Sequence, residues 1–311
     1  MSELNLSDLN ERAKASASAL IESAEVQYHS IIKKVAEETE RNSKIRIILL
    51  AGPSGSGKTT SANLICDAIK SRGRESMVIS LDDFYRNSTD PEYPRLENGE
   101  RDFESLDALD VPMLRNMLMK ISLGEKFTIP KYDFKIGKRS SVRSHKPMPE
   151  GVVIIEGLHA LNPRVFSLLP KERLYKIFVS VSTNINNAGE RILSGRKIRF
   201  VRRMVRDNIY RNADARRTLS MWENVLRGED IYLYPNRDNA DVSFNTFHEF
   251  ELGVMRPFVE KLISPELALE NEYAKIVREA LLAVFPIKLS LVPGNSLIRE
   301  FVPGGIYEEL Y

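Results

Sequence analysis

Cysteine and histidine are scarce in this chain. Its 311 residues include one cysteine, Cys66, and four histidines. A single cysteine excludes a disulfide framework and a thiolate metal cluster. The histidines do not have the spacing of metal ligands, and we interpret His159, which follows an acidic strand end, as structural. Cys66 falls on the face of a predicted helix, where we expect a small buried side chain.

An excess of one charge and long apolar runs are also missing. Lys and Arg number 45 against 43 for Asp and Glu, so the overall charge gives no reason to expect a nucleic acid or a membrane as partner. No signal peptide opens the chain and no stretch is suited to span a bilayer. We therefore expect a soluble cytoplasmic protein with one large domain or two small ones.

A glycine-rich loop stands out from this background. Residues 52–60 (GPSGSGKTT) match the phosphate-binding pattern G-x-x-x-x-G-K-[ST] at every fixed place. Residues 45–51 before it predict a buried parallel strand, and residues 60–70 after it predict a helix. The N–H groups of such a loop and helix start form a nest for phosphate oxygens. We therefore predict a nucleoside triphosphate site formed by Gly52, Ser54, Gly55, Ser56, Gly57, Lys58, Thr59 and Thr60.

Two more predicted strands end in acidic residues. Residues 75–81 lead into Asp82 and Asp83, and residues 152–155 lead into Glu156. In a doubly wound sheet the carboxyl ends of parallel strands face one crevice. Beside a triphosphate, such acids can accept a hydroxyl proton and help to bind Mg²⁺. We expect Mg²⁺ to be held by Thr59, Asp82 and Glu156, with Lys58 on the phosphates. The alternative for the Asp pair is an ordinary turn at a strand end.

The other predicted elements complete an α/β protein. Strands are predicted at residues 175–181 and 240–244, and a helix is predicted to start near Ser105. Residues 126–134 indicate an extended edge segment. The basic run at 135–146 is either a solvated loop or a contact with the substrate.

The most basic stretch lies between residues 191 and 217. Ten Arg and Lys residues fall there, with few acids among them. A nucleic-acid arm would need interleaved aromatic residues, and only two occur. A mobile lid that brings arginines over the phosphates is the preferred interpretation. Arg199, Arg203 and Arg206 share one helical face in it.

The N-terminal 43 residues predict an amphipathic helix. Ser7 is its expected N-cap, and Leu20, Ala24, Tyr28 and Val35 belong to one apolar stripe. Such a helix can pack on the rest of the chain, mediate self-association, or belong to a larger upstream domain. Packing is the interpretation we prefer.

Taken together, these segments resemble the uridine kinase / phosphoribulokinase family of P-loop kinases. The greatest resemblance is to bacterial uridine kinase-like nucleoside kinases that carry an extra N-terminal domain. We expect that extra domain to be absent from this chain. The matching motifs are GPSGSGKTT, LDDFY, DFESLDALD, PKYDF, VVIIEG, RRMVRD, TLSMWENVLRGE and the tail SLIREFVPGG.

The resemblance implies a P-loop NTPase-type doubly wound parallel sheet with a helical lid, to which the predicted N-terminal helix is added. We therefore expect an N-terminal helix at 1–43, a kinase domain at 44–263 with a lid at about 190–217, and a helical extension and tail at 264–311. It also implies a homo-oligomer.

The resemblance further implies that the γ-phosphoryl of ATP passes, with Mg²⁺, to a hydroxyl of a small molecule, most often the 5′-hydroxyl of a nucleoside. Asp82 matches the general base, and Glu104 the acid that binds the ribose hydroxyls. The catalytic set implied in this way is Asp82, Lys58, Arg203 and Arg206. The substrate-binding set is Tyr85, Glu104, Tyr132, Phe134, Arg139, Arg203 and Arg211.

Two departures from the family pattern keep alternatives open. Gly137 stands where uridine–cytidine kinases have a base-reading histidine, and Asn212-Ala213 replace a Gly-Arg pair. The acceptor is then either a nucleoside or a sugar phosphate or other polyol, and a non-catalytic ATP-binding sensor is a further alternative. A GTPase-type switch is disfavoured because the chain has neither [NT]-K-x-D nor D-x-x-G.

Overall fold

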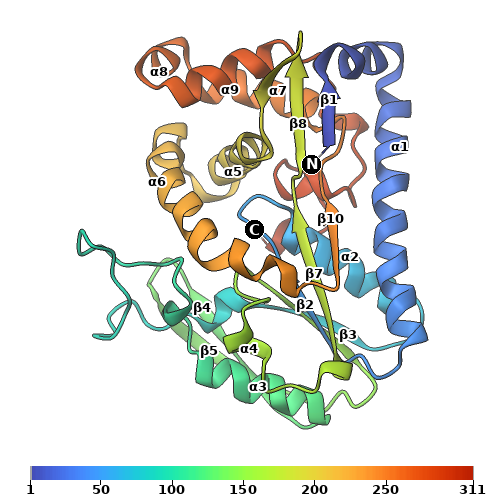
Figure 1. Ribbon diagram of the computed structural model, residues 1–311, viewed down its shortest axis with the longest axis vertical. Coiled ribbons are helices and arrows are strands. Elements are labelled where there is room, and N and C mark those ends of the chain that lie inside the picture. The colour runs from blue at the N-terminus through green and yellow to red at the C-terminus, as the bar shows by residue number, and fades with distance from the viewer. Residues whose placement is uncertain (1, 311) are drawn as a thin grey trace.

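The computed structural model describes residues 2–310, and a fully parallel five-stranded sheet forms its centre (Figure 1). The strand order is β10-β7-β2-β6-β3. All five residues of the central strand β2 are buried, as expected for a continuous apolar run covered on both faces. The α/β parallel architecture predicted from the sequence is confirmed. The five strands are β2 (Ile47–Ala51), β3 (Ser76–Ser80), β6 (Val152–Glu156), β7 (Leu174–Ser180) and β10 (Val242–Asn245).

Alternate side chains of β2 enter two separate cores. Ile48 and Leu50 belong to one apolar cluster, whereas Ile47 and Leu49 belong to the other. This division follows from the two-residue period of a strand. The helices of the first cluster include α1 (Leu6–Arg41), α2 (Lys58–Lys70), α5 (Gly195–Arg211), α7 (Glu251–Leu262) and α9 (Glu272–Leu282). Those of the second include α3 (Val111–Leu123) and α4 (Pro163–Phe166).

Helix α1 runs along one side of the molecule and packs on α2 (Figure 1). Leu20, Tyr28 and Val35 on its predicted stripe are buried. The predicted N-cap was wrong, because the helix begins at Leu6 with Asn5 as its N-cap residue. The division of the chain into three parts stays a prediction, since residues of α1 and of the C-terminal tail enter the same apolar cluster as α2.

A small sheet of order β1-β8-β9 was not foreseen from the sequence. Its strands are β1 (Ser2–Asn5), β8 (Thr183–Asn187) and β9 (Glu190–Leu193), and β9 lies in the segment expected to begin the lid. Ala188 and Gly189 join β8 to β9 with φ of 49° and 83°. Two positive φ values in a two-residue loop are typical of the tight turns of β-hairpins. The Ala188-Gly189 pair was therefore the sequence signal for this hairpin.

Two elements between residues 105 and 146 also differ from expectation. Helix α3 starts at Val111, where Asp110 accepts a hydrogen bond from the Met113 N–H at 3.0 Å, and Ser105 only caps a single 3₁₀ turn. Asp at the N-cap with Pro at the first turn is the stronger start signal. The basic run, for which a solvated loop and a substrate contact were both open, forms strand β5 (Lys138–His145), which pairs antiparallel with β4 (Phe127–Asp133).

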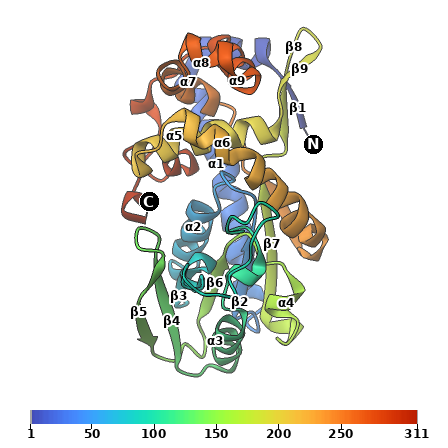
Figure 2. The same ribbon diagram turned by 90° about the vertical axis from the view of Figure 1, so that its left-hand side faces the viewer.

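Helices from the C-terminal half form a second layer beside the sheet (Figure 2). They include α6 (Ala215–Gly228) and α8 (Pro265–Glu270), after which residues 289–310 return toward α2 in short turns. None of the helices in the described part of the chain has the length and apolar character needed to cross a membrane.

Candidate active site

The glycine loop connects β2 to α2 in the order that its motif requires. Gly55 and Gly57 have φ of 71° and 83°, and Gly57 is the N-cap residue of α2. A Cβ atom on Gly52 would lie 2.3 Å from the carbonyl oxygen of Val179, so the backbone of β7 leaves no room for a side chain there. Lys58 Nζ donates to the carbonyl oxygen of Pro53 at 3.1 Å. The loop is therefore a compact backbone turn with its lysine folded across it.

Two acids meet at the carboxyl edge of the sheet, beside this loop. Glu156 ends β6 and pairs in register with Ser80, the last residue of β3, and Asp82 follows two residues later. Burial raises the pKa of Glu156 to about 7, Lys58 opposes the rise, and Asp82 adds to it. Burial also raises the pKa of Asp82, and Lys58 and Arg211 oppose this rise. The structure thus brings Lys58, Asp82 and Glu156 into one electrostatic cluster.

The same cluster fits a Mg²⁺ ion that takes most of its ligands from phosphate and water. No group of three or more His, Cys, Asp or Glu side chains within residues 2–310 is arranged to hold a metal. Mg²⁺ is usually bound by one or two carboxylates together with substrate phosphates. Asp82 and Glu156 destabilise each other's charge, which a cation would relieve. Thr59, Asp82 and Glu156 stay the predicted ligands on this basis.

Three arginines of α5 share a single carboxylate. Arg203, Arg206 and Arg211 lie 3.3, 2.9 and 3.3 Å from the oxygens of Asp207. The positive charge of Arg206, followed by burial, lowers the pKa of Arg211 to about 10. Arg203 Nη1 also donates to Ser54 Oγ at 2.8 Å. This excess of guanidinium groups beside the glycine loop suits phosphate oxygens.

Two other arginines of the basic stretch have a different role from the one expected. Arg199 forms a fully buried ion pair with Glu229 at 2.7 Å and donates to the carbonyl oxygen of Ser54 at 2.9 Å. Arg202 pairs with Glu251 at 2.6 Å, and both side chains are fully buried. These pairs fix α5 to the back of the glycine loop. Whether any part of the segment moves as a lid stays a prediction.

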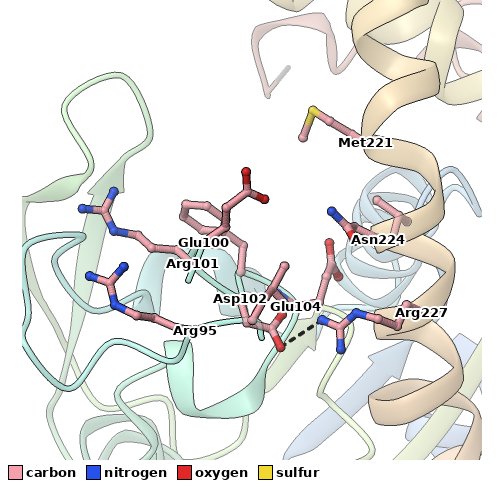
Figure 3. A pocket seen from close by; sticks show the side chains of 11 residues that line it. Arg95, Glu100, Arg101, Asp102, Glu104, Met221, Asn224 and Arg227 are labelled. Atoms are coloured by element: carbon pink, nitrogen blue, oxygen red, sulfur yellow. Dashed lines mark hydrogen bonds and ion pairs between the residues drawn. The ribbon is translucent and has the colours of Figure 1, made fainter. Parts of the chain in front are cut away.

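A cavity of about 490 Å³ lies between the loop at residues 95–104 and α6 (Figure 3). Glu104 stands between them, because a Cβ on Gly228 of α6 would be 2.4 Å from the Glu104 Cβ. Burial raises the pKa of Glu104 to about 7, and Arg203 opposes this rise. Glu104 therefore lines the cavity and also interacts electrostatically with Arg203, one of the arginines beside the glycine loop. The lining residues are Arg95, Leu96, Glu100, Arg101, Asp102, Phe103, Glu104, Met221, Asn224, Val225 and Arg227.

Three aromatic residues of the predicted substrate-binding set form one cluster. The ring centroid of Tyr132 lies 5.5 Å from Tyr85 and 4.9 Å from Phe134. Phe134 is 62% exposed, which leaves a ring face open to a ligand. Arg139 donates instead to Asp110 at 3.0 Å and to the carbonyl oxygen of Tyr85. Its predicted contact with the substrate stays untested beside this supporting role.

Glycine is required at the position where relatives carry a base-reading histidine. Gly137 has a φ of +65°, and a Cβ there would lie 2.5 Å from Ser88 Oγ. A histidine would be strained and would collide with Ser88. His159 is buried, and burial lowers its pKa to about 4, so it is neutral, and its ring meets Tyr232 edge-on. This chain offers no histidine at that place.

Sequence reasoning missed several residues of the site. Glu229 accepts a hydrogen bond from the Ser54 N–H at 2.9 Å, and Glu300 accepts one from the Thr60 N–H at 3.1 Å. The shortage of acids within the basic stretch was the available signal, because buried arginines need partners from elsewhere. Asn224 and Met221 had no recognisable signal.

Comparison with known proteins now identifies the family. The model of the Phosphoribulokinase / Uridine kinase family matches residues 47–252. The chain belongs to the phosphoribulokinase / uridine kinase family.

Individual proteins resemble this chain at low sequence identity. The uridine kinase of Borrelia hermsii is 30% identical over 200 residues, which cover 64% of this chain and 85% of that protein. Uridine kinase-like protein 4 of Arabidopsis thaliana is 31% identical over 198 residues, covering 63% of this chain and 37% of the relative. The chain thus spans less than half the length of this plant relative. A solved structure of a possible uridine kinase from Bacillus stearothermophilus is 17% identical with a TM-score of 0.44, covering 65% of this chain and 89% of that one.

Proposed function

We propose that this family member is an ATP-dependent kinase that phosphorylates a hydroxyl of a small molecule, with the 5′-hydroxyl of a nucleoside as the acceptor. The observation that carries the proposal is the cluster of Lys58, Asp82 and Glu156 at the edge of the sheet, with the cavity behind Glu104 beside it. A phosphate site and a cavity for a second substrate are what a transfer between two substrates requires.

Each group has a defined task in this mechanism. The loop N–H groups and Lys58 hold the phosphates, and Arg203, Arg206 and Arg211 stabilise the charge that develops on the transferred group. Asp82 accepts the proton of the acceptor hydroxyl. Thr59, Asp82 and Glu156 would hold Mg²⁺, which would supply positive charge to the phosphates. Positioning and electrostatics supply the rate.

Four features support a nucleoside as the acceptor. The aromatic cluster of Tyr85, Tyr132 and Phe134 offers ring faces on which a base can stack. Glu104, which lines the cavity, would accept hydrogen bonds from ribose hydroxyls. A volume of about 490 Å³ is within the range of small-molecule sites, and the relatives above carry the name uridine kinase.

A sugar phosphate is the second candidate. Arg95 and Arg101 line the cavity, and neither forms an ion pair with another residue of the described chain. Arg95 Nη1 donates to the carbonyl oxygen of Gly99 at 2.8 Å, and guanidinium groups without a carboxylate partner suit an anionic acceptor. Gly137 also removes the side chain that would read a base.

An ADP-release assay with Mg-ATP tests the proposal against nucleosides, sugar phosphates and polyols. Release that depends on uridine or cytidine would support the nucleoside kinase. Release with a sugar phosphate alone would keep the mechanism and replace the acceptor. No release with any acceptor, together with measured ATP binding, would favour a non-catalytic ATP sensor. GTP in place of ATP in the same assay determines the donor.

A further inference from the structure

The C-terminal tail reaches the phosphate-binding end of α2. Leu297 occupies the space beside Gly57, where an added Cβ would lie 2.7 Å from Leu297 Cδ1. Ile298 and Phe301 are fully buried, and the red tail lies next to α2 in both overall views. Arg299 donates to the carbonyl oxygens of Leu289 and Val292, which holds the tail in its turns. The tail is therefore a packed part of the site.

Glu300 places a carboxylate on the first turn of α2. Its Oε2 accepts the Thr60 N–H at 3.1 Å, and its side chain is buried, with the residue 4% exposed. The first N–H groups of a helix have no partner within the helix, and an anion there is stabilised by the helix dipole. The same N–H groups cradle phosphates in loops of this type. Glu300 thus shares this helix end with the nucleotide.

The N-terminal helix holds the same turn from the other side. Tyr28 of α1 lies 2.6 Å from Ser61 Oγ, which in turn donates to the carbonyl oxygen of Gly57 at 2.6 Å. Residues from both ends of the described chain therefore meet at two consecutive residues of α2, directly behind the glycine loop.

The carboxylate of Glu300 has no cationic partner. It forms no ion pair with any of residues 2–310, and its charge helps to raise the pKa of Glu156. It also helps to raise the pKa of Tyr28, which burial and Glu25 raise and Arg202 lowers, and the Arg202 guanidinium lies over the ring of Phe301. A buried carboxylate is costly unless a specific interaction offsets the cost.

We propose that Glu300 is a positioning residue of the nucleotide site: it fixes the first turn of α2 through the Thr60 N–H, and its negative charge limits how tightly that end of the helix holds a triphosphate. This inference rests on the proposed nucleotide binding and goes beyond it by making the tail part of the site. It does not depend on which acceptor is phosphorylated.

Calorimetric titration of the full chain with Mg-ATP, without acceptor, tests the proposal. Glu300→Gln keeps the shape and an acceptor oxygen but removes the charge, and we expect it to bind ATP about fivefold tighter. Glu309→Gln, which removes an exposed charge from the same tail, is the matched control and should bind like the unmodified protein. Equal affinity in all three proteins would overturn the limiting role of the charge.

Two further readouts separate positioning from simple packing. Glu300→Met removes both charge and hydrogen bond, so we expect a lower melting temperature than for Glu300→Gln, with turnover reduced severalfold. In Glu300→Gln the KM for ATP should fall while kcat changes little, because the substitution acts on nucleotide binding and keeps an acceptor oxygen for the Thr60 N–H. An unchanged KM for ATP in Glu300→Gln together with an unchanged turnover in Glu300→Met would overturn the proposal. If the unmodified protein binds no ATP, both this inference and the proposed function fail; ATP binding without any acceptor turnover removes only the kinase.

Discussion

The two halves of the site are built in different ways. On the phosphate side, fully buried ion pairs such as Arg199–Glu229 hold the carbonyl and N–H groups of the glycine loop. On the acceptor side, the exposed residues Arg95 and Arg101 line the cavity from a loop, and their guanidinium groups point away from α6 (Figure 3). Preorganised dipoles stabilise a transition state most when they do not have to move. Under the proposed function, the phosphate side would therefore be rigid, and few residues would specify the acceptor on the other side.

The charges of the two halves differ as well. The phosphate side sets three arginines against Asp207, and two carboxylates beside one lysine. The acceptor side pairs Arg227 with Asp102 at 3.1 Å, which leaves Glu104 and the exposed arginines to meet a ligand. Changes on the phosphate side should thus affect every acceptor, whereas changes on the acceptor side should affect some acceptors only.

The largest effect is expected for Asp82→Asn. Removing the proton acceptor should lower kcat by about 10²- to 10⁴-fold while ATP binding stays nearly intact. Steady-state ADP release and calorimetric ATP titration measure the two quantities. Asp83→Asn is the control, since Asp83 pairs with Lys131 at 3.2 Å on the outer side. Near-normal turnover in Asp82→Asn would remove Asp82 from the role of base.

Breaking a buried pair should cost stability next. Arg199→Ala leaves Glu229 without its partner in the interior, so we expect the free energy of unfolding to fall by about 3–5 kcal/mol in urea denaturation. Arg196→Ala, which loses an exposed pair with Asp230 and a contact with the ring of Tyr234, should cost less than about 1 kcal/mol. A loss for Arg199→Ala as small as that for Arg196→Ala would mean that the pair does not hold the loop.

Glu104→Gln tests the acceptor side alone. We expect kcat/KM for the acceptor to fall about 10- to 100-fold, because the carboxylate that faces the cavity loses its charge, while the KM for ATP changes little. Glu100→Gln changes an exposed acid of the same cavity and should have a small effect. A rise in the KM for ATP instead would assign Glu104 to the phosphate side.

The sequence predicted the phosphate side more completely than the acceptor side. The pattern around Lys58 and the acids at the ends of two apolar strands fix local backbone geometry, so their positions follow from short segments. Glu229 and Glu300 come from segments far from the loop, and tertiary packing alone brings them to it. The cavity wall at Asn224 depends on how α6 lies against a loop, which no periodicity records.

The pH dependence should reflect the two raised carboxylates. The pKa values of Glu156 and Glu104 are about 7, above those of ordinary carboxyl groups, so both become protonated as the pH falls through 7. If ionised Glu156 is needed, kcat/KM for Mg-ATP should fall about tenfold per pH unit below 7. A flat profile from pH 8 to 6 would contradict this.

The stability of the nucleotide-free protein should change in the opposite direction. Between the unfolded pKa and 7 the folded state binds more protons, so Glu156 and Glu104 make the free energy of unfolding rise as the pH falls from 8 toward 5. Urea denaturation at several pH values measures this. Glu156→Gln should reduce the slope, while Glu260→Gln, an exposed control, should leave it unchanged.

The smallest effect is expected for Arg101→Ala. This variant tests most directly whether the acceptor side distinguishes neutral from anionic acceptors. With a nucleoside acceptor the variant should stay within about twofold of the unmodified protein, since an exposed guanidinium gives a neutral ligand little. With a sugar phosphate, loss of a charge-assisted contact should reduce kcat/KM by about tenfold or more. Arg164→Ala, outside the cavity, is the control. Measuring kcat/KM for both acceptors in one variant separates the two candidates. A decrease restricted to the sugar phosphate would show that Arg101 contacts an anion. No decrease with either acceptor would show that this part of the cavity selects by shape alone.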